Sequence, residues 1–153
     1  MRALIQRVTH AEVAVDGQVV GRCGRGWLIL LGVGPEDTRE TALRLWEKIR
    51  GLRAFDDGEG KMNLSLVDVE GEVLVVSQFT LYADVRHGRR PSFTGTAVPD
   101  VAEPLYEYFC SLAERDATHV GRGVFGAEMA VSLVNDGPVT LMIDTDELSR
   151  HGA

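Results

Sequence analysis

The first third of the chain alternates apolar and polar residues in a pattern that predicts β-strands. β-Branched residues are frequent in this region, and turn-forming residues interrupt it at short intervals. The pair Asp16-Gly17 lies between two such runs and predicts a two-residue hairpin turn, because both residue types tolerate a positive φ. The strands predicted here span residues 2–8, 11–15, 18–22 and 27–33.

Two later stretches carry apolar residues at the spacing of an α-helix. In the first, Asp37 or Thr38 can provide the N-terminal cap. Its predicted buried face consists of Ala42, Leu45, Trp46, Ile49 and Leu52. The second helix is predicted to begin between residues 100 and 104, because a proline such as Pro104 belongs in the first turn of a helix. Its predicted buried face consists of Leu105, Tyr108, Phe109 and Leu112.

Three further strands complete the prediction. Residues 72–76 form a nearly continuous apolar run, and residues 128–134 and 139–144 form two strands joined by a turn at residues 135–138. Strands therefore cluster instead of alternating with helices. This order favours an α+β fold with a mixed or antiparallel sheet and two main helices, and not a Rossmann fold. Because no repeats or linkers interrupt the chain, residues 1–153 are predicted to form a single domain.

Composition is that of a globular protein. Hydrophobic residues make up 44% and charged residues 25% of the chain, and no apolar run is long enough to cross a bilayer. The N-terminus lacks the pattern of a secretory signal, so we expect a cytoplasmic protein. Cys23 and Cys110 are then expected to be reduced thiols, although a disulfide between them is conceivable. Neither these cysteines nor the histidines have the spacing of a metal site, and no metal is expected.

The net charge of −7 disfavours broad, nonspecific binding to nucleic acid. The local exception is a basic cluster containing Arg86, Arg89 and Arg90. A protein that holds only the end of a nucleic acid needs a small basic patch of this kind. A solvated loop with no binding role explains the cluster equally well.

Two short segments could carry chemistry. Ser77-Gln78-Phe79-Thr80 follows the apolar run 72–76, and strand ends can present polar side chains and backbone N–H groups to a ligand. The alternative is a strand that simply reaches the surface. No Gly-x-Ser-x-Gly elbow and no obvious histidine base accompanies these hydroxyls. In residues 135–138, a Gly-Pro pair offers bare carbonyl oxygens and permits a cis bond, but an ordinary tight turn also explains this composition.

Taken together, residues 77–80 and 135–140 resemble the two signature segments of the D-aminoacyl-tRNA deacylase family. Residues 118–124 are less similar to the family than the rest, and residues after Thr145 carry no recognised signal. The matching stretches are residues 1–3 with 5–8, 58–66, 75–84, 88–93, 125–129 and 131–140.

This resemblance implies a layered β-β-α sandwich that forms a homodimer, with the active site at the subunit interface and no cofactor. Residues 77–80 would line the pocket for the terminal adenosine and the aminoacyl group. Gly137-Pro138 would contain a cis bond and reach into the partner's pocket, where its carbonyls would exclude an L-side chain. Arg7 would hold that segment, Phe125 and Met129 would pack the pocket, and the basic cluster at residues 86–90 would contact tRNA phosphates.

The implied activity is hydrolysis of the ester bond of D-aminoacyl-tRNA, which serves as chiral proofreading in translation and extends in principle to glycine mischarged on tRNA-Ala. We expect backbone N–H groups around Gln78 and Phe79 to stabilise the oxyanion, with water activated through the substrate's 2′-hydroxyl. A rival mechanism makes Thr80 the nucleophile, but no clear base accompanies it. Two other functions stay open: a hydrolase of other esters or amides, and a dimeric module that binds nucleotide ends without chemistry.

Overall fold

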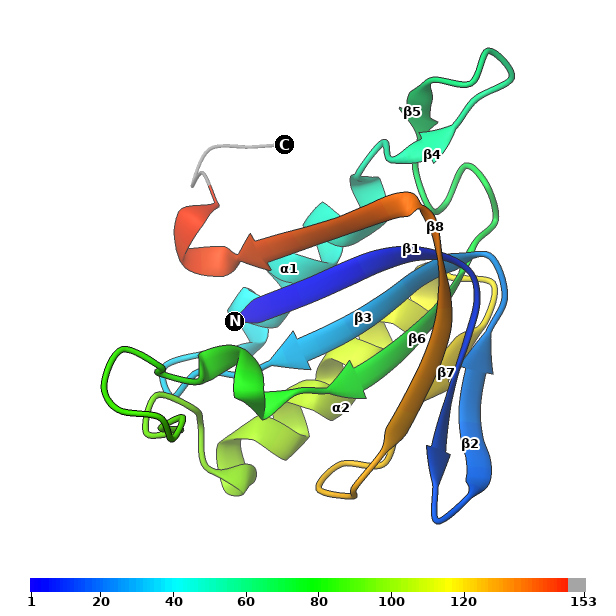
Figure 1. Cartoon of the computed structure of the whole chain (residues 1–153). Helices are drawn as coiled ribbons and strands as arrows, with labels where there is room; N and C mark the ends of the chain where they lie inside the picture. Colours follow the sequence, from blue (N-terminus) through cyan, green and yellow to red (C-terminus); the bar gives the residue numbers. More distant parts are fainter. Residues whose placement is uncertain (149–153) are drawn as a thin grey trace.

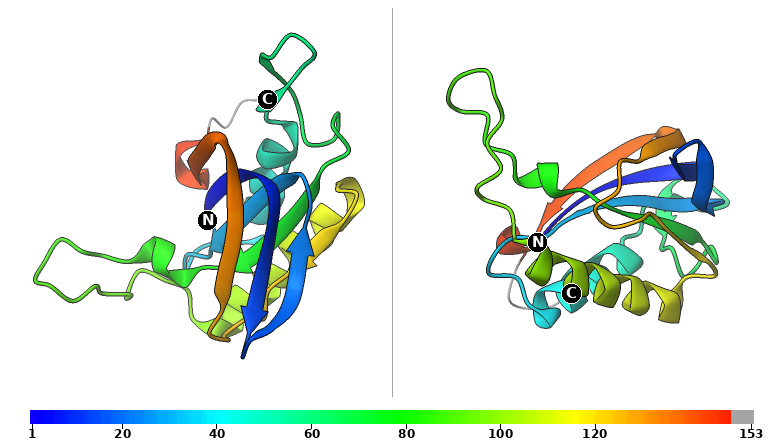
Figure 2. Two further views of the ribbon diagram at one scale, coloured as in Figure 1. Left: turned by 45° about the vertical axis from the view of Figure 1, so that its right-hand side comes forward. Right: turned by 90° about the horizontal axis from the view of Figure 1, so that it is seen from below.

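A curled six-stranded sheet forms the centre of the computed structural model, which describes residues 1–148 (Figure 1). The strands follow the order β2-β1-β3-β6-β7, and β8 pairs with the other edge of β1. Two helices cover one face of this sheet, as the view from below shows (Figure 2). The strands are β1 (Arg2–Val15), β2 (Gln18–Cys23), β3 (Gly26–Gly32), β6 (Glu72–Ser77), β7 (Val120–Arg122) and β8 (Ala130–Asp144). A small separate hairpin consists of β4 (Phe55–Asp56) and β5 (Met62–Leu64).

Strands β1 and β8 are each longer than predicted. The predicted strands 2–8 and 11–15 are one continuous strand, and so are the predicted strands 128–134 and 139–144. The prediction of a turn between the last two was wrong, because both halves of β8 pair with β1 and not with each other. Residues 135–138 are instead a break in register within one ladder. The hairpin at Asp16-Gly17 is confirmed, with φ values of 51° and 79°.

The sheet curls until its first and last strands meet. Strands β3, β6 and β7 pair in parallel, whereas β1 pairs antiparallel with β2, β3 and β8. Strands β2 and β7 then come close together at two glycines, one on each strand, because glycine has no side chain to separate them. A Cβ added to Gly21 would lie 2.2 Å from the carbonyl oxygen of Arg122, and one added to Gly121 would lie 2.3 Å from that of Arg22. Any side chain at either glycine would therefore force the curled sheet apart.

Helix α1 (Arg39–Gly51) is capped by Thr38, whose hydroxyl accepts a hydrogen bond from the N–H of Thr41. Asp37, the other predicted cap, instead accepts hydrogen bonds from the N–H of Gly34 and from the amino group of Met1. The prediction of Thr38 is therefore confirmed.

Helix α2 (Pro99–Asp116) begins one residue before the predicted range, because Pro99 itself occupies the first turn. Pro104 lies in the second turn, so the prediction that it marks the start was wrong. The buried face also shifts. Tyr106 is buried and its hydroxyl donates to the carbonyl of Val75 at 2.8 Å. Tyr108, predicted to be buried, is only partly covered and lies beneath the guanidinium of Arg39.

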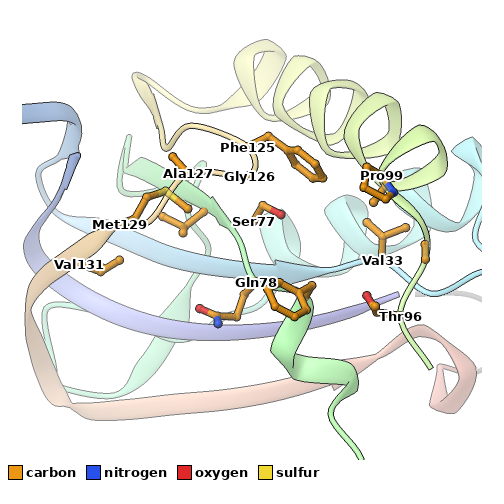
Figure 3. Close-up of a pocket in the computed structure, with 14 residues that line it drawn as sticks. Val33, Ser77, Gln78, Thr96, Pro99, Phe125, Gly126, Ala127, Met129 and Val131 are labelled. Atoms are coloured by element: carbon orange, nitrogen blue, oxygen red, sulfur yellow. The ribbon is translucent and has the colours of Figure 1, made fainter. Parts of the chain in front are cut away.

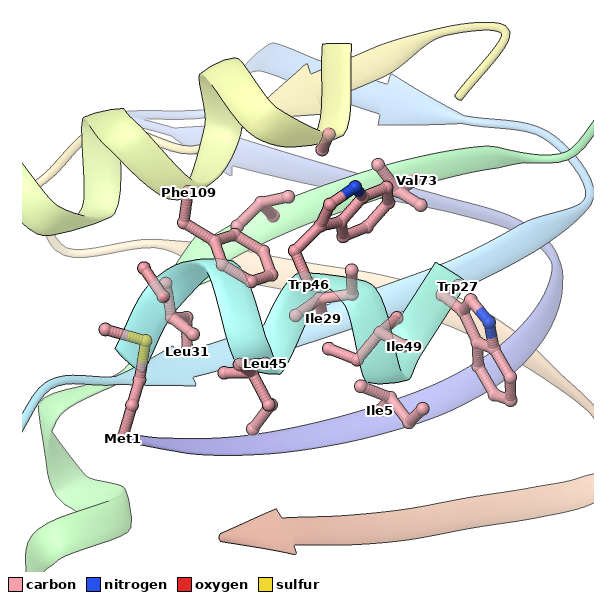
Figure 4. Packing of buried hydrophobic residues seen from close by; sticks show 14 of the residues in the cluster. Met1, Ile5, Trp27, Ile29, Leu31, Leu45, Trp46, Ile49, Val73 and Phe109 are labelled. Carbon is pink, nitrogen blue, oxygen red and sulfur yellow. The ribbon is translucent and has the colours of Figure 1, made fainter. Parts of the chain in front are cut away.

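Two hydrophobic cores stabilise the two faces of the sheet. The larger core lies between the sheet and the helices, where Trp46 and Phe109 pack edge to face at 5.7 Å (Figure 4). The smaller core fills the inside of the curl and includes Val8, Leu28 and Val76. Burial of each such side chain contributes about 1.5–3 kcal/mol. The inner core ends next to the pocket described below, so the two share a wall.

Both cysteines are free and buried, and burial raises the pKa of the Cys23 and Cys110 thiols to about 12. They are therefore uncharged and unreactive at neutral pH. No helix within residues 1–148 is long and apolar enough to cross a membrane. The same residues contain no group of His, Cys, Asp and Glu side chains arranged to hold a metal ion. His151, one of the four histidines, lies outside the described residues.

Candidate functional site

A cavity of about 440 Å³ opens at the carboxyl end of β6 (Figure 3). Its floor is the end of β6 and the segment that follows. One wall is the loop between β7 and β8, and the other comprises the segment before α2 and the first turn of that helix. The labelled lining residues include Ser77, Gln78, Thr96, Pro99, Phe125 and Met129.

Strand β6 places Ser77 and Gln78 at the floor of this cavity. Four consecutive residues of β6, Val73–Val76, are buried, and the strand pairs in parallel with β3 and β7. The ladder continues one residue beyond the strand, because the N–H of Gln78 donates to the carbonyl of Leu31 at 2.7 Å. The 3-10 helix η1 (Phe79–Tyr82) then turns the chain away from the sheet.

The free backbone donors at this turn differ from those expected. The N–H of Gln78 is already bonded to β3, so its predicted availability for an oxyanion was wrong. The N–H groups of Phe79 and Thr80 begin η1 and donate to no backbone carbonyl within residues 1–148. The first N–H groups of a helix have no partner inside it and can bind a ligand oxygen. Phe79 and Thr80 are therefore the available donors.

Arg2 fixes the position of η1. Its Nη1 donates to the carbonyl of Leu81 at 2.9 Å, and its Nε donates to the Asp144 carboxylate at 3.0 Å. The guanidinium also lies 4.4 Å from the centre of the Tyr82 ring. The start of β1 and the end of β8 thus hold the segment that carries the free N–H groups.

Thr80 does not line the cavity, although it lies beside it in the sequence. Its hydroxyl accepts a hydrogen bond from the side-chain amide of Gln78. No histidine or lysine within residues 1–148 forms a hydrogen bond with Thr80. The geometry therefore supplies no base that would activate this hydroxyl as a nucleophile.

The structure brings Phe125 and Met129 to the cavity wall, where the resemblance expected them. The ring of Phe125 lies 6.1 Å from that of Tyr106 on α2, which fixes the wall against the helix. The opposite wall, which includes Ala97 and Pro99, was not predicted. Its only sequence signal was a proline in the first turn of a helix, preceded by small residues.

Gly137 and Pro138 do not line the cavity of their own chain. They are exposed in the break within β8, and the bond between them is cis. In the β1–β8 ladder, Gln6 pairs with Thr140 and Val8 pairs with Asn135. On β1, only Arg7 lies between these two pairs, whereas residues 136–139 lie between them on β8. The extra residues therefore project from the ladder. We call residues 135–140 the bulge.

Arg7 holds the bulge from inside the fold. Its side chain is 93% buried, its Nε donates to the carbonyl of Asp136 at 3.0 Å, and its Nη1 donates to the carbonyl of Ala54 at 2.7 Å. The carboxylates of Asp56 and Asp136 lie 3.4 and 3.6 Å from the same guanidinium. The rigid fork of donors therefore ties the bulge to the segment leading into β4.

Asn135 holds the bulge from its base. The residue lies in the signature segment 135–140, but the sequence assigned no role to its side chain. Its side-chain oxygen accepts from the N–H of Val139 at 3.0 Å, and its side-chain nitrogen donates to the hydroxyl of Thr140 at 2.8 Å. Gly137 is confined between these supports with φ of 130°. A Cβ there would lie 2.9 Å from Val139 Cγ2 and 3.0 Å from Arg7 Nη2.

The basic cluster lies on a projecting loop, residues 84–93, which we call the arm (green, left view of Figure 2). Asp84 and Ser92 pair at its base through two backbone hydrogen bonds. Arg86 donates to the Asp84 carboxylate at 2.9 and 2.8 Å, and these hydrogen bonds lower the pKa of Asp84 to about 2. Arg89 and Arg90 are exposed and have no ion-pair partner within residues 1–148.

Comparison with known proteins connects this geometry to a family. The sequence profile described as D-Tyr-tRNA(Tyr) deacylase matches residues 4–144. The chain belongs to the D-Tyr-tRNA(Tyr) deacylase family. Membership confirms the resemblance inferred from the two signature segments.

Relatives of this deacylase family member match it over nearly their full length. A D-aminoacyl-tRNA deacylase from Roseiflexus castenholzii is 59% identical over 145 residues, which cover 95% of this chain and 92% of the relative. One from Chloroflexus aurantiacus is 60% identical over 148 residues, covering 97% and 92%. A solved structure named c-Myc DNA unwinding element binding protein superposes with a TM-score of 0.88 at 39% identity, covering 94% and 98%. The predicted α+β class with a mixed sheet and two helices is confirmed.

Proposed function

We propose that this member of the deacylase family hydrolyses the ester bond that joins a D-amino acid to the terminal adenosine of tRNA. The observation that carries the proposal is the largely apolar cavity at the end of β6, which is lined by Phe79. The backbone N–H groups of Phe79 and of Thr80, the next residue, donate to no backbone carbonyl within residues 1–148. An apolar pocket with few polar groups suits a nucleoside and an aminoacyl side chain. The curated relatives are named for this reaction.

The reaction needs no protein nucleophile. Water adds to the ester carbonyl carbon, and the N–H groups of Phe79 and Thr80 stabilise the resulting oxyanion. The 2′-hydroxyl of the terminal ribose accepts the proton of the attacking water and passes a proton to the 3′-oxygen as the ester bond breaks. Free D-amino acid and tRNA leave. Thr80 serves as a partner of Gln78 and not as the attacking group.

The chirality filter comes from a second copy of the chain in a homodimer. Gly137 and Pro138 are exposed and stand outside the cavity of their own chain, so they are free to enter a partner's cavity. Strand β8 is an edge strand with large apolar residues facing solvent: Val134 is 46%, Leu141 38% and Met142 53% exposed. Such a surface favours self-association. The bare carbonyls of the bulge would then clash with an L-side chain and leave a D-residue or glycine unobstructed.

The remaining tRNA contacts are few. Arg89 and Arg90 on the arm are available for phosphates, whereas Arg86 is already paired with Asp84. A net charge of −7 disfavours a broad grip on duplex nucleic acid, including the DNA after which one structural neighbour is named. We place the enzyme in the cytoplasm, where tRNA is charged.

The decisive test compares D-Tyr-tRNA and L-Tyr-tRNA as substrates without added cofactor. We expect multiple turnovers on the D-form and a rate at least about a hundredfold lower on the L-form, because the L-side chain meets the bulge. Equal rates on both forms would overturn the proposal. Equal activity on a D-tyrosine alkyl ester would favour a general esterase, and binding without turnover would favour a nucleotide-end-binding module.

A further inference from the structure

The mouth of the cavity carries a pair of exposed aromatic rings. Phe79 lines the cavity yet is 53% exposed, and Phe93 at the base of the arm is 38% exposed. Their ring centroids lie 5.1 Å apart at an interplanar angle of 72°. Phenylalanine rings are usually buried, so two that touch each other at the rim of a pocket require an explanation beyond stability.

We propose that this ring pair and the tip of the arm form a second subsite, which holds the unpaired nucleotides that precede the terminal adenosine of tRNA. Phe79 and Phe93 provide a stacking surface for the penultimate base. Arg89 and Arg90 contact the phosphates behind it. The inference rests on the proposed function and adds a stretch of substrate that lies outside the cavity.

The size and position of the cavity support a subsite outside it. A volume of about 440 Å³ suits one nucleoside with its aminoacyl group, so the preceding nucleotide has to lie outside. Because Phe79 lies at the rim of the cavity and touches Phe93, a strand leaving on this side meets both rings. Bases stack on aromatic rings whatever their sequence, and removal of such a ring typically weakens binding by about five- to a hundredfold.

The charges of the arm favour the same ligand. The base of the arm is fixed by hydrogen bonds of 2.7 and 2.9 Å between the backbones of Asp84 and Ser92. Arg86 is paired with Asp84 within this base, so it stabilises the arm and is not free for phosphate. Arg89 and Arg90 are exposed and lack an ion-pair partner within residues 1–148, and Phe93 follows them by four and three residues. The arm therefore combines an exposed ring with arginines close to it in the sequence, and aromatic rings together with basic side chains are typical of proteins that bind single-stranded nucleic acid.

The test separates the subsite from the cavity by using two substrates. One is full-length D-Tyr-tRNA, and the other is the D-tyrosyl ester of adenosine, which ends at the cavity. For Phe93→Ala, we expect KM for the tRNA to rise about tenfold and KM for the nucleoside ester to change by less than about twofold, with rescue by Phe93→Trp. Met62→Ala, which removes another exposed apolar side chain on β5, should change neither value.

The double variant Arg89→Ala/Arg90→Ala should raise KM for the tRNA and reduce its dependence on salt, because fewer phosphates are neutralised. Arg115→Ala removes an exposed charge from the last turn of α2 and serves as the matched control. Direct binding of the oligonucleotide ACCA, compared with adenosine, gives a second readout that does not depend on turnover. Both variants should weaken ACCA binding more than adenosine binding.

Three outcomes would overturn the inference while leaving the proposed function intact. Equal rises in KM for both substrates would mean that Phe93 supports the cavity itself. Unchanged KM for the tRNA and unchanged ACCA binding would mean that no nucleotide lies there. Loss of the homodimer in Phe93→Ala would mean that a second copy covers the rings. A different result would contradict the proposed function and support the subsite. In that case the wild-type protein would bind ACCA, Phe93→Ala would bind it more weakly, and the wild type would hydrolyse no D-Tyr-tRNA.

Discussion

The two segments that define the site are held in opposite ways. Residues 77 and 78 continue a buried parallel strand, and their position is set by the backbone ladder with β3 and by the core behind it. Residues 79 and 80 follow directly in η1, which a hydrogen bond from Arg2 to Leu81 also holds. The bulge, residues 135–140, leaves its ladder, so its position depends on the side chains of Arg7 and Asn135. The floor of the pocket should therefore tolerate side-chain changes without moving, whereas the bulge should not.

This contrast matches the chemistry that each segment performs in the proposed reaction. An oxyanion site needs N–H groups at fixed positions. The backbone ladder fixes Gln78, which directly precedes these donors, and the side chain of Arg2 holds the 3-10 helix that carries them. In the proposed homodimer, a chirality filter has to project beyond the sheet into the other subunit. Its residues then cannot form ladder hydrogen bonds with a neighbouring strand of their own chain. Side-chain hydrogen bonds to the backbone then replace the missing strand pairing.

The largest effect should come from Arg7→Ala. The variant leaves the carbonyls of Ala54 and Asp136 without their buried donor, and we expect unfolding stability to fall by about 2–4 kcal/mol. Activity on D-Tyr-tRNA should fall as well, because the bulge loses its anchor. Urea unfolding and deacylation rates measure the two losses. Arg7→Lys keeps the charge but cannot donate to both carbonyls as the guanidinium does. Wild-type stability and activity in the lysine variant would contradict this account.

Gly137→Ala should affect activity more than stability. The added methyl meets Val139 and Arg7 at 2.9–3.0 Å in a backbone conformation with φ of 130°, so the bulge must shift. We expect kcat/KM for D-Tyr-tRNA to fall at least about tenfold, with about 1–2 kcal/mol lost in stability. Gly60→Ala is the matched control, since Gly60 also has a positive φ but nothing within 4 Å. Equal loss of activity in both variants would rule out a specific role for the bulge.

A smaller effect is expected for Asn135→Ala. Loss of both hydrogen bonds at the base of the bulge should cost about 1 kcal/mol in stability and raise the L/D rate ratio several-fold. Asn135→Asp keeps the acceptor for the N–H of Val139 but loses the donor to Thr140, so it should lie between alanine and wild type. Thermal unfolding and paired D- and L-Tyr-tRNA rates provide the measurement. An unchanged ratio in the alanine variant would show that Arg7 alone positions the bulge.

The smallest effect belongs to the floor of the pocket. Thr80→Ala removes the hydroxyl that Gln78 contacts but leaves the backbone N–H in place, so we expect turnover to fall no more than about fivefold. Single-turnover rates on D-Tyr-tRNA measure it, with Thr80→Ser as the control that keeps the hydroxyl. A loss of about a thousandfold that serine restores would instead make Thr80 the nucleophile.

Local patterns in the sequence predicted the elements that local interactions determine. The helical spacing of Leu45, Trp46 and Ile49 predicted α1, and Asp16-Gly17 predicted its hairpin, because each depends on residues close in the chain. The continuity of β8 could not be predicted in this way. Turn-forming residues at 135–138 break the pattern, and only pairing with β1, more than a hundred residues away, shows that the strand continues.

The same distinction applies to the site. The composition of residues 77–80 indicated the floor of the pocket, but the bond from the N–H of Gln78 to Leu31 depends on a neighbouring strand and changes which donors are free. The wall at Ala97 and Pro99 consists of small residues without a chemical signature. The sequence predicts a turn residue at Asn135, because its bonds to Val139 and Thr140 exist only once the bulge has formed.

The two tryptophans lie in different environments, which should be visible in their fluorescence. Both are fully buried, but the indole nitrogen of Trp46 donates to Asp116 at 2.8 Å, whereas that of Trp27 has no hydrogen-bond partner within residues 1–148. Trp27 also pairs with Arg7 across the β1–β3 ladder. Because their indole nitrogens lie in different environments, we expect the two tryptophans to differ in fluorescence emission. With Trp46 replaced by phenylalanine, emission from Trp27 would report directly on the surroundings of the arginine that anchors the chirality filter.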